Sequence, residues 1–129
     1  MQTIEFILYV RDQKRSAEFY KKILGKEPVL DVPGMTEFEL GPSVKLGLMP
    51  ESGISKLLLP HMPHPSAGNG IPRCELYLYV NSPAADLALA LEAGAKLIEK
   101  ESVRNWGDSV AYCADPDGHI LAFAKKQNT

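Results

Sequence analysis

The sequence predicts an α+β fold built from two βαβββ modules, and three observations predict it. The first is an internal repeat: the segments "EFILYV", which starts at Glu5, and "ELYLYV", which starts at Glu75, align residue by residue. The second is that each segment runs into an amphipathic helix that stops at a glycine. The third is that each helix is followed by one strand-like segment and then by two more, which a tight turn joins. One structural unit is therefore expected twice.

In the first half, residues 5–10 are rich in β-branched and aromatic residues, as is typical of a strand. Asp12 is a suitable N-cap for the helix that follows, and Gly25 is a suitable left-handed stop. The apolar stripe of this helix consists of Ala17, Tyr20, Ile23 and Leu24. The segments "TEFEL" and "VKLGLM" then predict two strands around the turn at residues 41–43.

The second half repeats this order. Residues 75–80 predict a strand, and Ser82 followed by Pro83 forms a favourable helix start. The apolar residues of this helix are Leu87, Leu89, Ala90 and Leu91. Gly94 is a suitable stop. The segments "SVAYCA" and "HILAFAKK" predict two strands around the "DPDG" turn at residues 115–118, in which proline presets φ and glycine accepts a positive φ.

The length of 129 residues fits one compact domain. We expect module 1 at about residues 1–56, a proline-rich linker at about 57–72 and module 2 at about 73–126. His61 and His64 lie in the linker, in "PHMPHP". Their spacing would suit a metal site on a helix, but the flanking prolines favour an exposed, polyproline-like linker or lid.

Composition limits the partners and the compartment. A net charge of −2 predicts no basic face for nucleic acid, and no apolar run approaches the ~18 residues of a membrane span. The two cysteines, Cys74 and Cys113, make no disulfide framework, and the start "MQTIEF" lacks the features of a signal peptide. We therefore expect a cytoplasmic protein without nucleic-acid or membrane partners.

The duplicated βαβββ pattern, the opening "YVRDQKRSAEFYKKILG" and the closing "YCADPDGHILAF" resemble the vicinal oxygen chelate superfamily. This superfamily contains glyoxalase I, bleomycin-resistance proteins, extradiol dioxygenases and fosfomycin-resistance enzymes. The resemblance implies a glyoxalase-like fold in which the curved sheets of the two modules form a cup, often completed by a second subunit. A homodimer that binds a small molecule is therefore expected, while the activity stays open because one scaffold serves many chemistries.

Strand alternation decides which side chains face this cup. The polar face carries Glu5, Ile7 and Tyr9 in the first copy, and Glu75, Tyr77 and Tyr79 in the second. The opposite, wholly apolar face is expected to pack on the helices. Two carboxylates that open onto one cavity repel each other, and burial raises their pKa values, so a proton or a cation between them is expected. Lys45 or a bound cationic ligand could supply this positive charge. Alternatively, the two glutamates are solvated residues at the ends of strands and have no function.

The resemblance also implies where a metal would bind, because metal-dependent members take one His, Gln or Glu ligand from each of four strands. Carried onto this chain, the four positions are Glu5, Gly47, Glu75 and Ala122. Gly47 and Ala122 offer no donor atom, whereas transition-metal sites use three or four protein ligands. We therefore expect no cofactor, with weak binding of a divalent metal ion by Glu5 and Glu75 as the alternative.

Two further residues lie next to turns at the ends of predicted strands. Trp106, in "NWGDS" just ahead of a strand, is expected either to stack on a flat ligand or to plug the end of the sheet. His119 is expected at the surface beside a turn, pointing away from Ala122.

These observations predict metal-independent binding of a small aromatic or cationic molecule in the cup, with no catalytic residues assigned. The expected ligand-binding residues are Glu5, Tyr9, Glu75, Tyr77, Tyr79 and Trp106. One alternative is a metal-dependent lyase or dioxygenase that recruits a histidine from the linker or a partner subunit. Another is a structural or regulatory module whose cup is filled by its own side chains.

Overall fold

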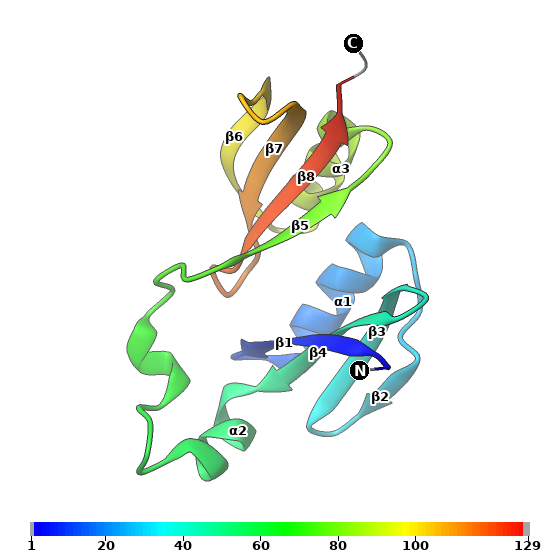
Figure 1. Ribbon diagram of the computed structural model, residues 1–129. Helices are drawn as coiled ribbons and strands as arrows, with labels where there is room; N and C mark the ends of the chain where they lie inside the picture. The colour runs from blue at the N-terminus through cyan, green and yellow to red at the C-terminus, as the bar shows by residue number, and fades with distance from the viewer. Residues whose placement is uncertain (1, 128–129) are drawn as a thin grey trace. The chain divides into compact units, whose positions relative to one another are not determined.

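The computed structural model of the protein describes residues 2–127. The chain divides into two compact units, with the boundary between Asn69 and Gly70. This boundary falls inside the expected linker. The sheets of the two units have the same topology (Figure 1).

Unit 1 contains a four-stranded mixed sheet. Its elements are β1 (Ile4–Val10), α1 (Gln13–Leu24), β2 (Leu30–Val32), β3 (Met35–Gly41), β4 (Val44–Pro50), α2 (Glu51–Leu58) and a short 3₁₀ helix (Pro65–Gly68). The strand order is β1-β4-β3-β2, with β1 parallel to β4 and the remaining pairs antiparallel. The first five elements form the predicted βαβββ module.

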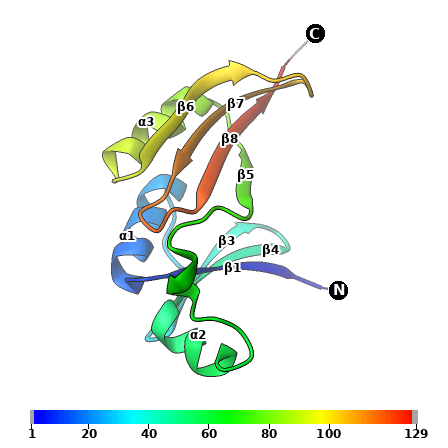
Figure 2. The same cartoon turned by 90° about the vertical axis from the view of Figure 1, so that its left-hand side faces the viewer.

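Unit 2 repeats this arrangement. Its elements are β5 (Glu75–Tyr79), α3 (Pro83–Glu92), β6 (Lys96–Val103), β7 (Asp108–Ala114) and β8 (Ile120–Lys126). The strand order is β5-β8-β7-β6, with β5 parallel to β8. Helix α3 packs along one face of β6, β7 and β8 (Figure 2). The predicted α+β fold of two βαβββ modules is confirmed.

The register of the two sheets confirms the repeat at the level of single residues. Ile7 lies opposite Gly47 in the parallel pair β1–β4, and Tyr77 lies opposite Ala122 in the parallel pair β5–β8. Because Ile7 and Tyr77 occupy the same place in the repeat, Gly47 and Ala122 are equivalent positions. The alignment that placed both of them at metal-ligand positions of the superfamily therefore matches the strand pairing.

The predicted caps explain where the helices begin and end. The Asp12 side chain accepts a hydrogen bond from the backbone N–H of Arg15, and Gly25 closes α1 with a left-handed φ of 65°. Ser82 caps α3 in the same way, with Pro83 as the first helical residue. The apolar stripe of α1 differs from the expectation: the buried residues are Ser16, Phe19, Tyr20 and Ile23.

Each unit packs a helix against one face of its sheet. In unit 1 the buried side chains include Val10, Phe38, Leu46 and Leu48, together with Phe19, Tyr20 and Ile23 of α1. In unit 2 they include Cys113, Leu121 and Phe123, together with Leu87 and Ala90 of α3. Each large apolar side chain buried in this way contributes about 1.5–3 kcal/mol. Phe6 was expected on the packed face, but it is 54% exposed because it lies on the edge strand β1, whereas α1 packs on β3 and β4.

The linker is more structured than expected. Helix α2 was not predicted, and it reaches from module 1 into the expected linker. His61 is exposed, and the Nδ1 atom of His64 accepts a hydrogen bond from the backbone N–H of Ser66, which caps the 3₁₀ helix. Both cysteines are free, Cys113 buried and Cys74 exposed. Among the helices of residues 2–127, none is both long enough and apolar enough to cross a membrane.

Candidate functional site

The open face of the unit 1 sheet carries a cluster of charged side chains around a glycine. Glu5 on β1 lies opposite Lys45 on β4, and Gly47 on β4 lies between Ile7 of β1 and Glu37 of β3. Side chains alternate along a strand, so residues that lie opposite each other point to the same face. We refer to Glu5, Glu37 and Lys45 together as the carboxyl–lysine cluster.

The Glu5 carboxyl group lies over Gly47. A Cβ atom at residue 47 would stand 2.5 Å from Glu5 Oε2, 3.1 Å from Ile7 Cγ1 and 3.3 Å from Met35 Sδ. A glycine is therefore needed here for the close approach of the carboxyl group to the sheet backbone. Glu5 Oε2 is buried, and it has no hydrogen-bond partner among the described residues.

Glu37 and Lys45 complete the cluster. Lys45 Nζ lies 3.6 Å from Glu37 Oε1, and the two side chains are 35% and 16% exposed respectively. Lys45 was expected on this face, whereas Glu37 was missed. The alternation of polar and apolar residues in "TEFEL" indicates the position of Glu37, because Glu37 and Glu39 occupy the face opposite to the buried Thr36 and Phe38.

The electrostatic environment of Glu5 follows from this arrangement. Burial raises the pKa of Glu5 above its ordinary value of 4.5. A hydrogen bond to Glu37, which forms only when one of the two carboxyl groups carries a proton, and repulsion between the two charges raise it further, while the Lys45 ammonium opposes these effects. With both groups ionised, Glu5 Oε2 has no donor among the described residues. Glu5 therefore favours either a bound proton or a nearby positive charge.

The donor set does not fit the divalent metal implied by the superfamily. Unit 1 offers two carboxyl groups beside an ammonium group, and the equivalent positions Gly47 and Ala122 have no donor atom. Across residues 2–127, no group of three or more His, Cys, Asp or Glu side chains is arranged to hold a metal ion. A transition metal would require more ligands than these.

In unit 2, Glu75 lies at the start of β5 and is exposed. Its partner across the strand pair is Ile120, where Glu5 has Lys45. The two glutamates thus occupy equivalent positions in different surroundings. That they open onto one cavity stays a prediction, because they belong to different units.

The open face of the unit 2 sheet is organised around Asp108. The hydroxyl groups of Tyr77 and Tyr79 both donate to Asp108 Oδ2, at 2.6 and 2.8 Å. Trp106 Nε1 donates to the Tyr77 hydroxyl at 3.0 Å, and Lys126 Nζ donates to the Tyr79 hydroxyl at 3.4 Å. We call these five residues the Asp108 network. It joins three residues expected to bind ligand, namely Tyr77, Tyr79 and Trp106.

Buried apolar residues of β7 and β8 support the Tyr77 ring. Val110, Ala122 and Ala124 form a buried apolar cluster, and Tyr77 and Tyr112 pack against it. The rings of Tyr77 and Tyr79 meet edge to face with centroids 5.5 Å apart. Ala122 stands at a metal-ligand position of the superfamily, and in this chain it packs beneath tyrosine rings instead.

Hydrogen bonding shifts the titration of the Asp108 network. Burial raises the pKa of the Tyr77 phenol to about 12, and its hydrogen bond to Asp108 acts in the same direction. The hydrogen bond from Tyr77 lowers the pKa of Asp108 below its ordinary value of 3.8, and the one from Tyr79 adds to this. Asp108, only 4% exposed, is therefore held as a carboxylate by tyrosine donors. It was not among the expected site residues, although "NWGDS" places it two residues after Trp106.

Two cations of unit 2 already stack on tyrosine rings. Lys126 Nζ lies 4.7 Å from the centroid of the Tyr79 ring, and the Arg104 guanidinium lies 5.2 Å from that of Tyr112. Arg104 also forms a salt bridge with Glu99 at 2.6 Å. Tyr79 and Trp106 nevertheless remain 56% and 57% exposed, so both rings keep surface for a ligand.

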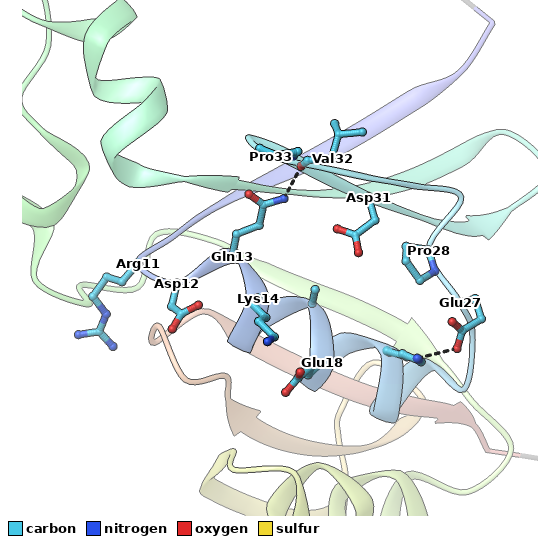
Figure 3. A pocket seen from close by; sticks show the side chains of 12 residues that line it. Arg11, Asp12, Gln13, Lys14, Glu18, Glu27, Pro28, Asp31, Val32 and Pro33 are labelled. Atoms are coloured by element: carbon cyan, nitrogen blue, oxygen red, sulfur yellow. Dashed lines mark hydrogen bonds and ion pairs between the residues drawn. The ribbon is translucent and has the colours of Figure 1, made fainter.

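A separate open groove lies between α1 and the β2 side of unit 1 (Figure 3). Gln13 spans it: its Nε2 donates to the carbonyl of Val32 at 2.8 Å and to Thr36 Oγ1 at 2.9 Å. The lining side chains carry both signs of charge, and Lys21 and Glu27 pair at 3.0 Å. None of the expected ligand-binding residues lines this groove.

Comparison with known proteins agrees with the topology. The family model for the glyoxalase-like domain matches residues 3–126. A glyoxalase-related enzyme from Fulvimarina pelagi superposes with a TM-score of 0.81 at 22% identity, covering 97% of this chain and 88% of that chain. A glyoxalase/bleomycin resistance protein/dioxygenase family enzyme from Burkholderia phytofirmans gives 0.82 at 16% identity, with coverages of 95% and 97%. A protein from Agrobacterium tumefaciens, solved by NMR, gives 0.74 at 28% identity, with 96% of each chain covered. A search of curated proteins gave no match.

Proposed function

Because this chain belongs to the glyoxalase-like domain family, we propose that it binds a small aromatic or cationic molecule on its open sheet faces without a catalytic metal. The observation that carries the proposal is the Glu5 carboxyl group, which is partly buried over Gly47 with Oε2 lacking a partner among residues 2–127. In its ionised form such a group is costly to leave unpaired, and a ligand cation satisfies it.

The neighbours of Glu5 support a ligand with both a charged and an apolar part. Ile7 and Met35 approach the same glycine, and Tyr9 shares the face of β1. An ammonium group beside Glu5 gains from charge pairing, while Tyr9, further along β1, offers an aromatic surface to the other end of a longer ligand. The exposed rings of Tyr79 and Trp106 offer a similar aromatic surface on unit 2.

We propose that the protein functions as a cytoplasmic homodimer. The edge strand β1 leaves Ile4 and Phe6 exposed, which is typical of a surface that another protein surface covers. Light scattering coupled to gel filtration tests this: the mass of a dimer supports it, and the mass of a monomer at micromolar concentration contradicts it.

Isothermal titration calorimetry with a panel of cationic aromatic amines tests the function. We expect at least one to bind, with affinity reduced at least about tenfold in a Glu5→Gln variant. Glu92→Gln, at the exposed end of α3, is the matched control and should bind as the wild type does. If no amine binds, or if Glu5→Gln binds like the control, the proposal fails. Stoichiometric Ni, Zn, Fe or Mn in purified protein would instead favour a lyase or dioxygenase.

A further inference from the structure

We infer that Lys45 is a built-in counter-ion of the Glu5 and Glu37 carboxyl groups, so that this cluster accepts a singly charged organic cation and rejects a divalent metal ion. The inference rests on the proposed function and deepens it, because it names the charge class of the ligand and the residue that sets it.

The strand register places the three groups together. Lys45 lies opposite Glu5 on β1 and opposite Glu39 on β3, and its Nζ is 3.6 Å from Glu37 Oε1. Glu37 is the less exposed member of that ion pair, at 16%. Its carboxylate is therefore already paired, whereas Oε2 of Glu5 has no hydrogen-bond partner within residues 2–127. Glu39 is exposed, so solvent screens its charge.

The net charge of the carboxyl–lysine cluster distinguishes a singly charged organic cation from a divalent metal ion. Two carboxylates and one ammonium group leave a single negative charge when both glutamates are ionised. One additional positive charge brings the cluster to neutrality. A divalent ion would leave an excess positive charge close to the Lys45 ammonium, in a partly buried site where like charges repel strongly.

Coordination points the same way. The Lys45 side chain pairs with Glu37 as an ammonium group. An ammonium group has only hydrogen-bond donors and no lone pair, so in this form Lys45 cannot bind a metal ion. Gly47 offers no donor, and the space that a side chain would need there is taken by Glu5 Oε2. Glu5, at the first ligand position of the superfamily, thus occupies the space that a side chain at the second ligand position, Gly47, would need. A small ammonium group, which needs only acceptors around it, matches such a site.

Calorimetry with Mn²⁺ alone tests the role of Lys45, because Mn²⁺ suits carboxylate ligands. We expect no measurable binding to the wild type and none to Lys45→Arg, which keeps the charge. Lys45→Gln should gain Mn²⁺ affinity by at least about tenfold, and the added Glu37→Gln substitution should abolish the gain. If the Gln variant folds poorly, Lys45→Met removes the same charge and keeps a long side chain. Equal Mn²⁺ affinity in the wild type and in a charge-removed variant would overturn the inference.

A matched ligand pair distinguishes this inference from the proposed function. Benzylamine and 1,4-bis(aminomethyl)benzene share a ring and differ by one positive charge. The wild type should prefer benzylamine, and Lys45→Gln should shift the preference toward the diamine by at least about tenfold. Binding of both with a ratio unchanged by the substitution would refute the role of Lys45 and leave the proposed function standing. Failure of both amines to bind any variant would count against the proposed function, while the Mn²⁺ titrations would still decide the role of Lys45.

Discussion

The Glu5 carboxyl group and Gly47 are in direct contact, so that a Cβ at residue 47 would stand 2.5 Å from Glu5 Oε2. At this position the superfamily places a metal ligand, and here the absence of a side chain leaves room for a neighbouring carboxyl group instead. The consequences of this contact can be separated from those of the Asp108 network, because the two lie in different units.

Gly47→Ala should displace the Glu5 carboxyl group and weaken amine binding by at least about tenfold. The atom that must move furthest is the end of the flexible Glu5 side chain, so the free energy of unfolding should fall by only about 1 kcal/mol, the low end for overpacking. Calorimetry and urea unfolding measure the two effects. Gly41→Ala is the control, since a Cβ there meets nothing within 4 Å. A Gly47→Ala variant that binds like Gly41→Ala would show that the contact has no role in binding.

Glu5→Gln should change the pH dependence of stability. A carboxyl group with a raised folded-state pKa binds its proton more tightly when folded, so its contribution is complete below the unfolded value of 4.5 and is lost as the pH rises through the folded value. Above pH 4.5 the wild type should therefore lose stability relative to Glu5→Gln, which cannot ionise. Urea unfolding across the acid-to-neutral range measures the difference. If the difference in the free energy of unfolding between the two proteins stays constant with pH, the pKa of Glu5 is not raised in the folded protein.

Tyr77→Phe should remove a tyrosine that ionises late. The pKa of Tyr77 is about 12, so its phenol keeps its proton after an ordinary phenol, with a pKa of 10.0, has lost it. Its contribution to stability is complete below pH 10.0 and is lost as the pH rises toward 12. Ultraviolet absorbance during alkaline titration follows phenolate formation. The late absorbance change should be smaller in Tyr77→Phe than in the wild type, and a late change of undiminished size would disprove the assignment.

Asp108→Ala should destabilise unit 2, because two tyrosine hydroxyl groups lose their acceptor. We expect a fall of several degrees in Tm and a change in Trp106 fluorescence, since the indole N–H binds Tyr77. Because the pKa of Asp108 is lowered, its stabilising effect is present above 3.8 and fades as the pH falls below that value. The loss in Tm should accordingly be larger at neutral pH than in acid. An unchanged Tm at neutral pH would rule out the network as a source of stability.

Local patterns were sufficient to predict most of the fold. The caps at Asp12 and Ser82 and the "DPDG" turn each depend on residues close together in the sequence, and the repeat that starts at Glu5 and again at Glu75 shows that one unit occurs twice. The equivalence of Gly47 and Ala122 followed from the repeat and agrees with the strand register. Helix α2 was missed because its residues lie beside a proline-rich stretch that favours extended structure.

The candidate site was predicted only in part, because strand alternation gives the face of a side chain and not its partner. It placed Glu5 and Lys45 on one face, but the pairing of Lys45 with Glu37 depends on how β3 and β4 align. It likewise placed Tyr77 and Tyr79 together, but the acceptor of their hydroxyl groups, Asp108, comes from a strand far along the chain. Such contacts are set by register and side-chain conformation.

Amine titration of chelator-treated protein tests the central claim most directly. The protein is dialysed against EDTA, shown by elemental analysis to be free of metal, and titrated with benzylamine by calorimetry. The account predicts that benzylamine binds with the same affinity before and after chelation, and at least about tenfold more weakly in Glu5→Gln. Binding that disappears on chelation and returns when a divalent metal is added would contradict it.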